Sequence, residues 1–349
     1  MYVNPKDKIF WHLEEINQLK QTGKSNAPIN VEIDLTNRCN LGCDWCHFAY
    51  THTKGPLANS AKPAGFIDVG DVFDWELLND VLVQLRQQGV KSITWTGGGE
   101  PTLYYEFNKA IKAAQLIGLD QGIYTNGTRL DQEKAKLLKE YCTFVYISLD
   151  ECNAEDYEQS KGVNQFHKAI EGIKNLVDAV GTATIGVGFL LHERNYTKYP
   201  QMIDLAKSLG VDYCQFRPTI NYDQNNPSAA IEHPTWINYL PTVNLKNVVF
   251  DKERFLQYQN WLGHGYTTCY WSALQTVITP NGKVWRCVNK RGYEDALLGD
   301  LTQESFASIW ERSGEASVVD SKCRVMCRGH IANQTLDKLM KEPDHANFI

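Results

Sequence analysis

The sequence lacks any run of about 18 apolar residues, so it predicts no membrane-spanning helix. Residues 1–24 are charged and contain no apolar signal core, which argues against secretion and favours a cytoplasmic protein. No Lys/Arg-rich block and no low-complexity tract occurs, and the formal net charge is −6. An extended nucleic-acid track is therefore not favoured, although a single basic face stays open. What is present is an ordinary globular composition, with 43% hydrophobic and 22% charged residues in a chain of 349 residues, enough for a barrel-sized core.

The chain contains ten cysteines. In a chain without a secretion signal, such a number favours metal ligands or reduced thiols over disulfides. The first three form a C-x3-C-x2-C motif: Cys39, Cys43 and Cys46. A second group lies near the C-terminus: Cys269, Cys287, Cys323 and Cys327. The others stand apart in the sequence: Cys142, Cys152 and Cys214.

Short β-rich runs alternate with amphipathic helical patterns between residues 31 and 217. The predicted strands are Val31–Leu35, Lys91–Trp95, Gln121–Thr125, Phe144–Leu149, Thr184–Leu190 and Asp212–Phe216. The predicted helices are an opening helix Asp7–Lys20 and then Trp75–Gln88, Tyr105–Ile117, Asp131–Tyr141, Asn164–Val180 and Tyr199–Leu209. Strands that alternate with helices pair in parallel as right-handed βα units, so the pattern predicts an α/β fold.

Several predicted strands have one polar side. Glu32 and Asp34 share one side of the first strand, whereas Val31 and Ile33 share the other. The second and fourth strands show the same alternation. Buried parallel strands are usually apolar on both faces. We therefore expect a partial (β/α)6 TIM-like barrel whose strands surround a polar ligand cavity, with locally satisfied polar positions as the plainer alternative.

The alternation ends after Arg217, which indicates a change of domain. The predicted organisation is an N-terminal helical extension at 1–30, the barrel at 31–217, a bridging segment without a clear βα unit at 218–268, a small cysteine-bearing domain at 269–330 and a C-terminal tail at 331–349. An Asn-Gly pair between Gln275–Thr279 and Lys283–Val288 predicts a hairpin in the small domain. The connection His47–Gly70 is long for a βα unit, and it either covers a ligand or is a solvated insertion.

The first cysteine motif directly follows the first predicted strand. Three thiolates this close can hold three irons of a [4Fe–4S] cluster and leave the fourth iron open. Zinc sites usually have four protein ligands, often from paired C-x2-C units. His47 could supply a fourth ligand, so a structural zinc site remains the alternative at this point.

The residues around this motif resemble the cluster loop of radical S-adenosylmethionine (SAM) enzymes. Residues 35–46 read LTNRCNLGCDWC and include that family's aromatic residue, Trp45, before the third cysteine. Residues 96–101 read TGGGEP and resemble the family's second signature. The resemblance implies that this turn binds the methionine amino group of SAM through Gly97, Gly98, Gly99 and Glu100. Glycines let a backbone approach closely, and Glu100 offers a negative partner for an ammonium group.

The ends of the later predicted strands continue the resemblance. In similar enzymes such strand ends contact the ribose, carboxylate and adenine of SAM, as expected where C-terminal strand ends carry the chemistry of an α/β barrel. The resemblance implies these contacts for Asn126, Ser148, Asp150 and Arg217, with a turn or core role as the alternative for each. Cys152 follows the fourth strand and is a candidate donor of a hydrogen atom or proton, or else an ordinary loop residue. The remaining two cysteines are expected to be buried small hydrophobes: Cys142 and Cys214.

The second cysteine group resembles the auxiliary-cluster extension of many radical SAM enzymes, the SPASM/twitch type. Cys269 and Cys287 form C-x12-G-x4-C, and Cys323 and Cys327 form C-x3-C. A full SPASM domain has more cysteines and more than one cluster, so four cysteines imply the shorter form with one auxiliary [4Fe–4S] cluster. Four thiolate ligands would favour electron transfer, and three would leave an iron free to bind substrate. A zinc site from the same cysteines is the alternative.

The resemblance as a whole implies a radical SAM enzyme that reductively cleaves SAM at its [4Fe–4S] cluster. The 5′-deoxyadenosyl radical would abstract hydrogen from a C–H bond of a peptide or small polar metabolite, leading to oxidation, crosslinking, epimerisation or rearrangement. The implied partners are this substrate and an electron donor such as flavodoxin or ferredoxin. Two alternatives stay open: radical SAM modification of a nucleotide or nucleic-acid base, and a non-enzymatic Fe–S or zinc-binding scaffold.

Overall fold

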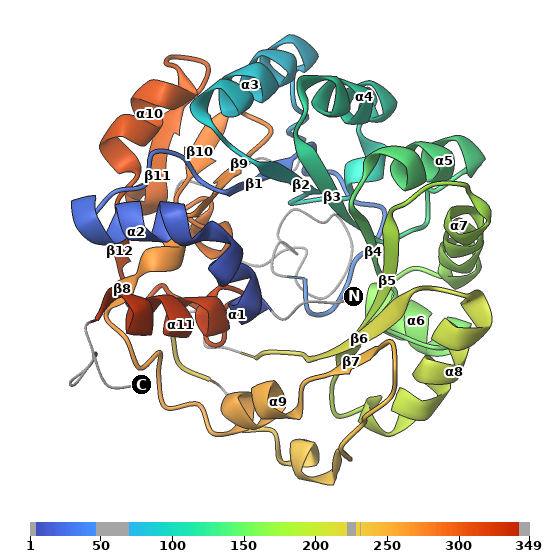
Figure 1. Ribbon diagram of the computed structural model, residues 1–349. Helices are drawn as coiled ribbons and strands as arrows, with labels where there is room; N and C mark the ends of the chain where they lie inside the picture. Colours follow the sequence, from blue (N-terminus) through green and yellow to red (C-terminus); the bar gives the residue numbers. More distant parts are fainter. Residues whose placement is uncertain (1–4, 47–69, 222–227, 231, 342–349) are drawn as a thin grey trace.

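The computed structural model describes residues 5–46, 70–221, 228–230 and 232–341. Its main feature is a curved sheet that surrounds an interior (Figure 1). The ten strands lie in the spatial order β11 (Leu297–Asp300), β10 (Lys283–Trp285), β9 (Gln275–Ile278), β1 (Asn30–Asp34), β2 (Ser92–Thr96), β3 (Asp120–Thr125), β4 (Phe144–Ser148), β5 (Thr184–Leu191), β6 (Tyr213–Pro218) and β7 (Val248–Phe250). Strands β1 to β6 pair in parallel, each with the next, so the predicted α/β partial barrel is confirmed.

Helices coat the outside of this sheet (Figure 1). Those around the barrel are α3 (Trp75–Gln88), α4 (Phe107–Ile117), α5 (Gln132–Tyr141), α6 (Ala154–Lys161), α7 (Phe166–Asp178), α8 (Tyr199–Leu209) and α9 (Lys252–Gln259). Nearer the chain ends are α1 (Pro5–Lys8), α2 (Leu13–Thr22), α10 (Phe306–Ser313) and α11 (His330–Met340). Short 3-10 turns are η1 (Ile9–His12), η3 (Pro101–Leu103), η4 (Tyr196–Lys198), η5 (Thr235–Tyr239), η6 (Tyr270–Ala273), η7 (Val288–Lys290) and η8 (Glu294–Ala296). A separate two-stranded sheet pairs β8 (Thr268–Cys269) with β12 (Ser317–Val318).

Local signals in the sequence set where the helices begin and end, as α3 shows. Asp74 precedes the helix, and its carboxylate accepts a hydrogen bond from the backbone N–H of Leu77 at 3.0 Å. The helix ends at Gly89, whose φ of +99° is a left-handed conformation that suits glycine. Leu78 and Leu85 lie on its buried face. The predicted boundaries of this helix therefore agree with the structure.

The sheet extends beyond the six predicted strands at both edges. Strand β7 pairs in parallel with β6 and leads into α9. The prediction that 218–268 contains no βα unit is therefore wrong, because a strand of three residues is too short to give a periodic signal. The predicted hairpin is present as β9 and β10, and β9 pairs in parallel with β1. The C-terminal unit thus continues the barrel sheet.

The two ends of the described chain form a second, smaller core. Ile16 and Leu19 from α2 pack with Leu274 and with Leu336 from α11. The predicted 331–349 tail is therefore a packed helix as far as Met340. The predicted opening helix is divided into α1, η1 and α2. Residues 47–69 of the predicted long connection lie outside the described residues.

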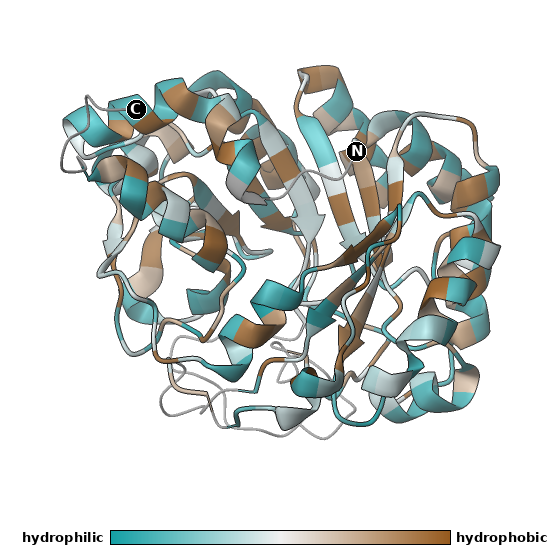
Figure 2. Cartoon of the chain, turned by 60° about the horizontal axis from the view of Figure 1, so that its bottom comes forward, coloured by the Kyte–Doolittle hydropathy of each residue, from teal (hydrophilic) through white to brown (hydrophobic). Residues whose placement is uncertain are grey.

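The two faces of the barrel sheet differ in polarity. Figure 2 shows long hydrophobic stretches on the strands and alternating hydrophobic and hydrophilic bands on the helices. In β6, Cys214 and Phe216 are buried, whereas the alternating residues Tyr213, Gln215 and Arg217 stay partly exposed. Successive side chains of a strand point to opposite faces, and the outer face lies under the helices. The inner, polar face of β6 is therefore partly accessible to solvent.

Candidate functional site

The loop after β1 is fastened to the end of α6. It carries the three cysteines of the first motif: Cys39, Cys43 and Cys46. The backbone N–H of Gly42 donates to the carbonyl oxygen of Lys161 at 2.8 Å, and that of Asp44 donates to the carbonyl oxygen of Ser160 at 3.0 Å. The side chain of Arg194 also pairs with Asp44, at 2.9 Å. These contacts fix the cysteine loop at the C-terminal end of the barrel strands.

Burial makes the loop thiols poor acids in the absence of a cation. It raises the pKa of Cys39 to about 12 and also raises the pKa of Cys43. A negative charge on Cys43 would raise the pKa of Cys39 further, so the two thiols are near each other. The Lys161 ammonium acts against burial, because its charge and its hydrogen bond lower the pKa of Cys43. Thiolate is the form that binds metal, so Lys161 stabilises the ligand form of this cysteine.

Lys161 is the site residue that the sequence analysis missed. Its side chain is 2% exposed and forms an ion pair with Asp150. Its Nζ also lies 5.5 Å from the centre of the Trp45 ring. Burial alone would lower the pKa of Lys161, but Asp150 and Cys43 raise it above its ordinary value, so the ammonium stays charged. A lysine that ends a helix is usually exposed and interacts with the helix dipole. The sequence position of Lys161 offered no sign that it differs from such a lysine.

Asp150 holds the turn between β4 and α6 in an unusual conformation. Its φ is +68°, which is uncommon for a residue other than glycine. Its backbone N–H donates to Gly188 at 3.0 Å, and its Oδ1 accepts from the backbone N–H of Leu190 at 3.1 Å. The described contacts of Asp150 thus tie Lys161 to β5, and its predicted contact with SAM stays a prediction.

The glycine-rich turn after β2 lies directly against the cysteine loop. A Cβ on Gly99 would overlap the carbonyl oxygen of Arg38, and one on Gly98 would overlap the side chain of Asn37. A Cβ on Gly97 would meet the backbone of Gly99. Glycine is therefore required for this approach of two backbones. The structure places the two predicted family signatures side by side.

Glu100 joins the ends of β2 and β3 from a buried position. Its Oε1 accepts hydrogen bonds from the hydroxyls of Thr102 and Thr125, both at 2.6 Å, and its Oε2 accepts from the backbone N–H of Asn126 at 2.8 Å. Burial raises the pKa of Glu100, and these hydrogen bonds oppose the rise. The described contacts organise the turn, and its pairing with the amino group of SAM stays a prediction.

The other predicted strand-end residues surround the same region. The side-chain amide of Asn126 donates to Asn40 of the cysteine loop at 2.9 Å. Ser148 is partly exposed at the end of β4. The guanidinium of Arg217 lies 5.1 Å from the centre of the Tyr146 ring. These positions agree with a rim around one binding region, and the contacts of these residues with SAM stay predictions.

The three isolated cysteines differ in exposure. Cys142 and Cys214 are buried, as the sequence predicts. Cys152 is partly exposed. Burial raises the pKa of Cys152, and the neighbouring carboxylates of Asp156 and Glu151 raise it further. A protonated thiol suits a hydrogen donor, and that role stays a prediction.

The second group of cysteines is distant in sequence and close in space. Its members come from the end of β8, the start of η7 and the segment before α11: Cys269, Cys287, Cys323 and Cys327. The charge of Cys327 interacts with those of the other three. Burial raises the pKa of Cys269 to about 12 and raises the pKa of Cys323 and Cys327. The structure thus brings the four predicted ligands near one another, and their binding of a cluster stays a prediction.

These two sets fit the thiolate ligands that an iron–sulfur cluster requires. In the described part of the chain, no group of three or more His, Cys, Asp and Glu side chains is placed to hold a single metal ion. A zinc ion needs all its sulfur ligands at about 2.3 Å from one centre. The sulfurs around a sulfide-bridged cluster bind different irons instead.

A buried charge network joins the C-terminal unit to the barrel interior. Arg291 forms an ion pair with Asp34 and lies 3.8 Å from Glu32. Arg328, next to a predicted cluster ligand, pairs with Glu32 at 2.6 Å. Burial raises the pKa of Asp34 to about 6, against the opposing effect of Arg291. Glu32 and Asp34, which the sequence predicts to line a cavity, thus form the ion pairs that hold the C-terminal unit against β1.

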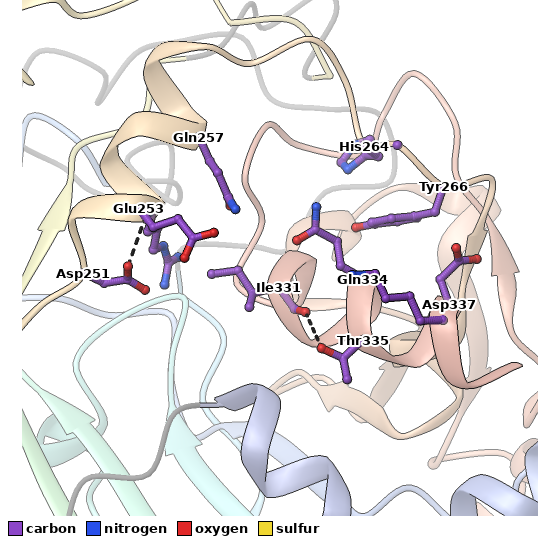
Figure 3. A pocket seen from close by; sticks show the side chains of 12 residues that line it. Asp251, Glu253, Gln257, His264, Tyr266, Ile331, Gln334, Thr335 and Asp337 are labelled. Carbon is purple, nitrogen blue, oxygen red and sulfur yellow. Dashed lines mark hydrogen bonds between the residues drawn. The ribbon is translucent and has the colours of Figure 1, made fainter. Parts of the chain in front are cut away.

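Two cavities open beside the two cysteine sites. One of about 640 Å³ lies at the ends of β5 and β6 and is lined by Trp45 and His192, among others. The other, of about 400 Å³, lies between α9 and α11 (Figure 3). Tyr266 lines this second cavity; burial raises its pKa, and the nearby auxiliary cysteines raise it further. Its hydroxyl lies 3.1 Å from Nδ1 of His330. Each cysteine site therefore has an adjacent opening of ligand size.

The fold and the two cysteine sites define an iron–sulfur protein of the partial-barrel class. Residues 33–206 match the model of the radical SAM superfamily, and residues 269–329 match that of SPASM, an iron–sulfur cluster-binding domain. The chain belongs to the radical SAM superfamily and carries a SPASM domain. Membership implies an enzyme with a [4Fe–4S] cluster, SAM and auxiliary iron–sulfur clusters. The non-enzymatic scaffold alternative is therefore set aside.

Two of the similar curated proteins have names that describe an enzyme. A protein named "Probable GTP 3′,8-cyclase" from Saccharolobus solfataricus is 29% identical over 190 residues, which is 52% of this chain and 54% of that protein. The mycofactocin maturase MftC of Mycobacterium tuberculosis is 26% identical over 305 residues, which is 82% of this chain and 71% of the maturase. The chain thus spans about half the length of the cyclase.

Solved structures share the fold at low identity. Streptococcus suis SuiB bound to the precursor peptide SuiA has a TM-score of 0.60 at 16% identity, over 89% of this chain and 70% of SuiB. The structure of anSMEcpe with bound AdoMet has a TM-score of 0.61 at 17% identity, over 82% of each chain. None of the helices in the described ranges is both long and apolar enough to cross a membrane.

Proposed function

We propose that this enzyme abstracts a hydrogen atom from a C–H bond of a peptide or small polar metabolite. The observation that carries the proposal is the position of the Cys39 loop, clamped between the glycine-rich turn and the Asp150–Lys161 pair at the mouth of a polar barrel. When bound, the [4Fe–4S] cluster and SAM supply a 5′-deoxyadenosyl radical as the hydrogen-abstracting species.

The residues of the chain would position these groups. Cys39, Cys43 and Cys46 would bind the first cluster, and Lys161 holds positive charge against Cys43. The backbone of Gly97–Gly99 leaves space for close approach to the loop. Asn126, Ser148, Asp150 and Arg217 would position SAM from the strand ends. Such positioning is the part of radical catalysis that a protein contributes.

The SPASM domain would add a redox centre. Cys269, Cys287, Cys323 and Cys327 would bind one auxiliary [4Fe–4S] cluster that takes part in electron transfer. An external donor of the flavodoxin or ferredoxin kind would supply reducing electrons. Figure 3 shows the cavity beside this site, lined by side chains from α9 and α11, which would receive a partner or substrate.

A peptide is the favoured substrate. The maturase relative is similar over most of both chains, and SuiB, whose fold is shared, was solved with a precursor peptide. The cyclase relative is similar over about half of each chain. Its nucleotide substrate therefore supports the alternative of nucleotide modification less strongly.

Release of 5′-deoxyadenosine tests this function. Anaerobic incubation of the reconstituted protein with SAM and dithionite should release it, and Cys43→Ala should abolish the release. Cys142→Ala removes a buried cysteine outside both sets and should leave the release intact. The proposal fails if a reconstituted protein with bound SAM and a full iron content releases none.

A further inference from the structure

Arg328 is a cation of the SPASM domain that reaches the barrel interior. Its Nη1 donates to Oε1 of Glu32 at 2.6 Å, and its Nη2 donates to Oε2 at 2.9 Å. The Glu32 side chain is 1% exposed, whereas that of Arg328 is 40% exposed. A guanidinium has five N–H donors, and Glu32 takes two of them on the buried side. The exposed side of Arg328 therefore has donors to offer to a ligand.

A second cation, Arg217, lies near Arg328. The positive charge of Arg217, which lies on β6, acts to lower the pKa of Arg328, so the two cations are near each other. The guanidinium of Arg217 lies over the ring of Tyr146. Two like charges that share an interior repel each other, and an anion between them relieves that repulsion.

Glycines on β5 let two tyrosine side chains lie against the inner face of the sheet. A Cβ on Gly186 would overlap the ring of Tyr213, and one on Gly188 would overlap the hydroxyl of Tyr146. The rings therefore lie across the β5 backbone, which only glycine permits. Rings held against the sheet take up less of the interior, and Tyr213 and Gln215 stay partly exposed there.

We propose that Arg328 is a specificity residue that binds a carboxylate group of the substrate, an inference that rests on the proposed function. A planar carboxylate matches the forked donors of a guanidinium. Glu32 and Asp34 are paired with Arg328 and Arg291, so the site has little net charge and suits a singly charged group. The substrate of this enzyme is therefore acidic at the point where it meets the SPASM domain.

Binding to two matched peptide libraries tests the proposal. One library consists of N-acetylated tripeptides with a free C-terminal carboxylate, and the other of the same tripeptides with a C-terminal carboxamide. Both are incubated anaerobically with the holoenzyme and SAM, and the retained peptides are identified by mass spectrometry. The acids should be retained about tenfold better or more, as expected for a charge-assisted hydrogen bond.

Variants at this site assign the preference to Arg328. Arg328→Gln should remove the preference for acids. Arg312→Gln is a matched control, because Arg312 is 48% exposed and also pairs with a glutamate, Glu304, but on the outer helix α10. Glu32→Gln keeps the cation and should keep the preference.

The double variant Glu32→Gln/Arg328→Gln guards against a folding defect. It removes both charges of the ion pair together and should retain SAM binding, measured by calorimetry, while it loses the preference. Equal retention of acids and amides by the natural protein, or an undiminished preference in the double variant, overturns the proposal. Selective retention of GTP over the acids in a parallel experiment also overturns it. The assay measures binding only, so its failure is distinct from a failure to release 5′-deoxyadenosine.

Discussion

Replacing Lys161 with glutamine should destabilise the protein, because Asp150 then remains as a buried carboxylate without its cation. The two side chains are 2% and 3% exposed. Removal of one partner from a buried ion pair costs about 3–5 kcal/mol. Asp150 keeps the hydrogen bond from the backbone N–H of Leu190 to its Oδ1 at 3.1 Å. We therefore expect a loss near the lower end, about 3 kcal/mol.

Anaerobic urea unfolding followed by circular dichroism measures this loss. The double variant Asp150→Asn/Lys161→Gln should recover most of it, because no charge remains and asparagine tolerates a positive φ. Lys198→Gln is the control: it breaks a more exposed pair with Asp156, at 2.5 Å, and should cost less than about 1 kcal/mol. A loss in Lys161→Gln no larger than in this control would refute the reasoning.

Three further changes probe other parts of the structure. Gly99→Ala should abolish SAM binding in calorimetry, because the new Cβ would overlap the carbonyl oxygen of Arg38; unchanged affinity would contradict the packing. Burial raises the pKa of Asp34 from 3.8 to about 6, so its stabilising contribution is present below about pH 4 and lost as pH rises through about 6. As the pH rises from 4 to 7, the stability difference between Asp34→Asn and the natural protein, measured by urea unfolding, should therefore shift in favour of the variant. A stability difference that does not change with pH would argue against the raised pKa. Leu336→Ala should cost about 3 kcal/mol in the same assay, because Leu336 is fully buried in the small core with Ile16; a loss below about 1 kcal/mol would mean that this core is loosely packed.

The features that could be predicted from the sequence are local ones. The first three cysteines lie in a single loop, so their proximity follows from the chain itself. Helix α3 has a capping aspartate, an apolar face and a terminal glycine, and its predicted and observed bounds coincide. The polar side of β1 was also visible as an alternation of residue types. Each of these signals is contained within a short stretch of sequence, where residue spacing indicates local structure directly.

Other features depended on contacts between distant segments. The strand Val248–Phe250 is recognised only by its pairing with β6. The packed C-terminal helix was predicted as a tail, although its buried face meets α2 at the other end of the chain. Such elements owe their stability to the surface that they cover, and short segments have little local preference of their own.

The sequence by itself determined the family, the two cysteine sets and the parallel βα order, because these reside in residue types and short spacings. Only the tertiary structure decided that Lys161 lies beside Cys43 and that Arg291 and Arg328 meet Asp34 and Glu32. A single lysine or arginine has no spacing that reveals its partner. The partner is set by where folding brings a buried carboxylate, since a charge removed from water must be paired within the protein.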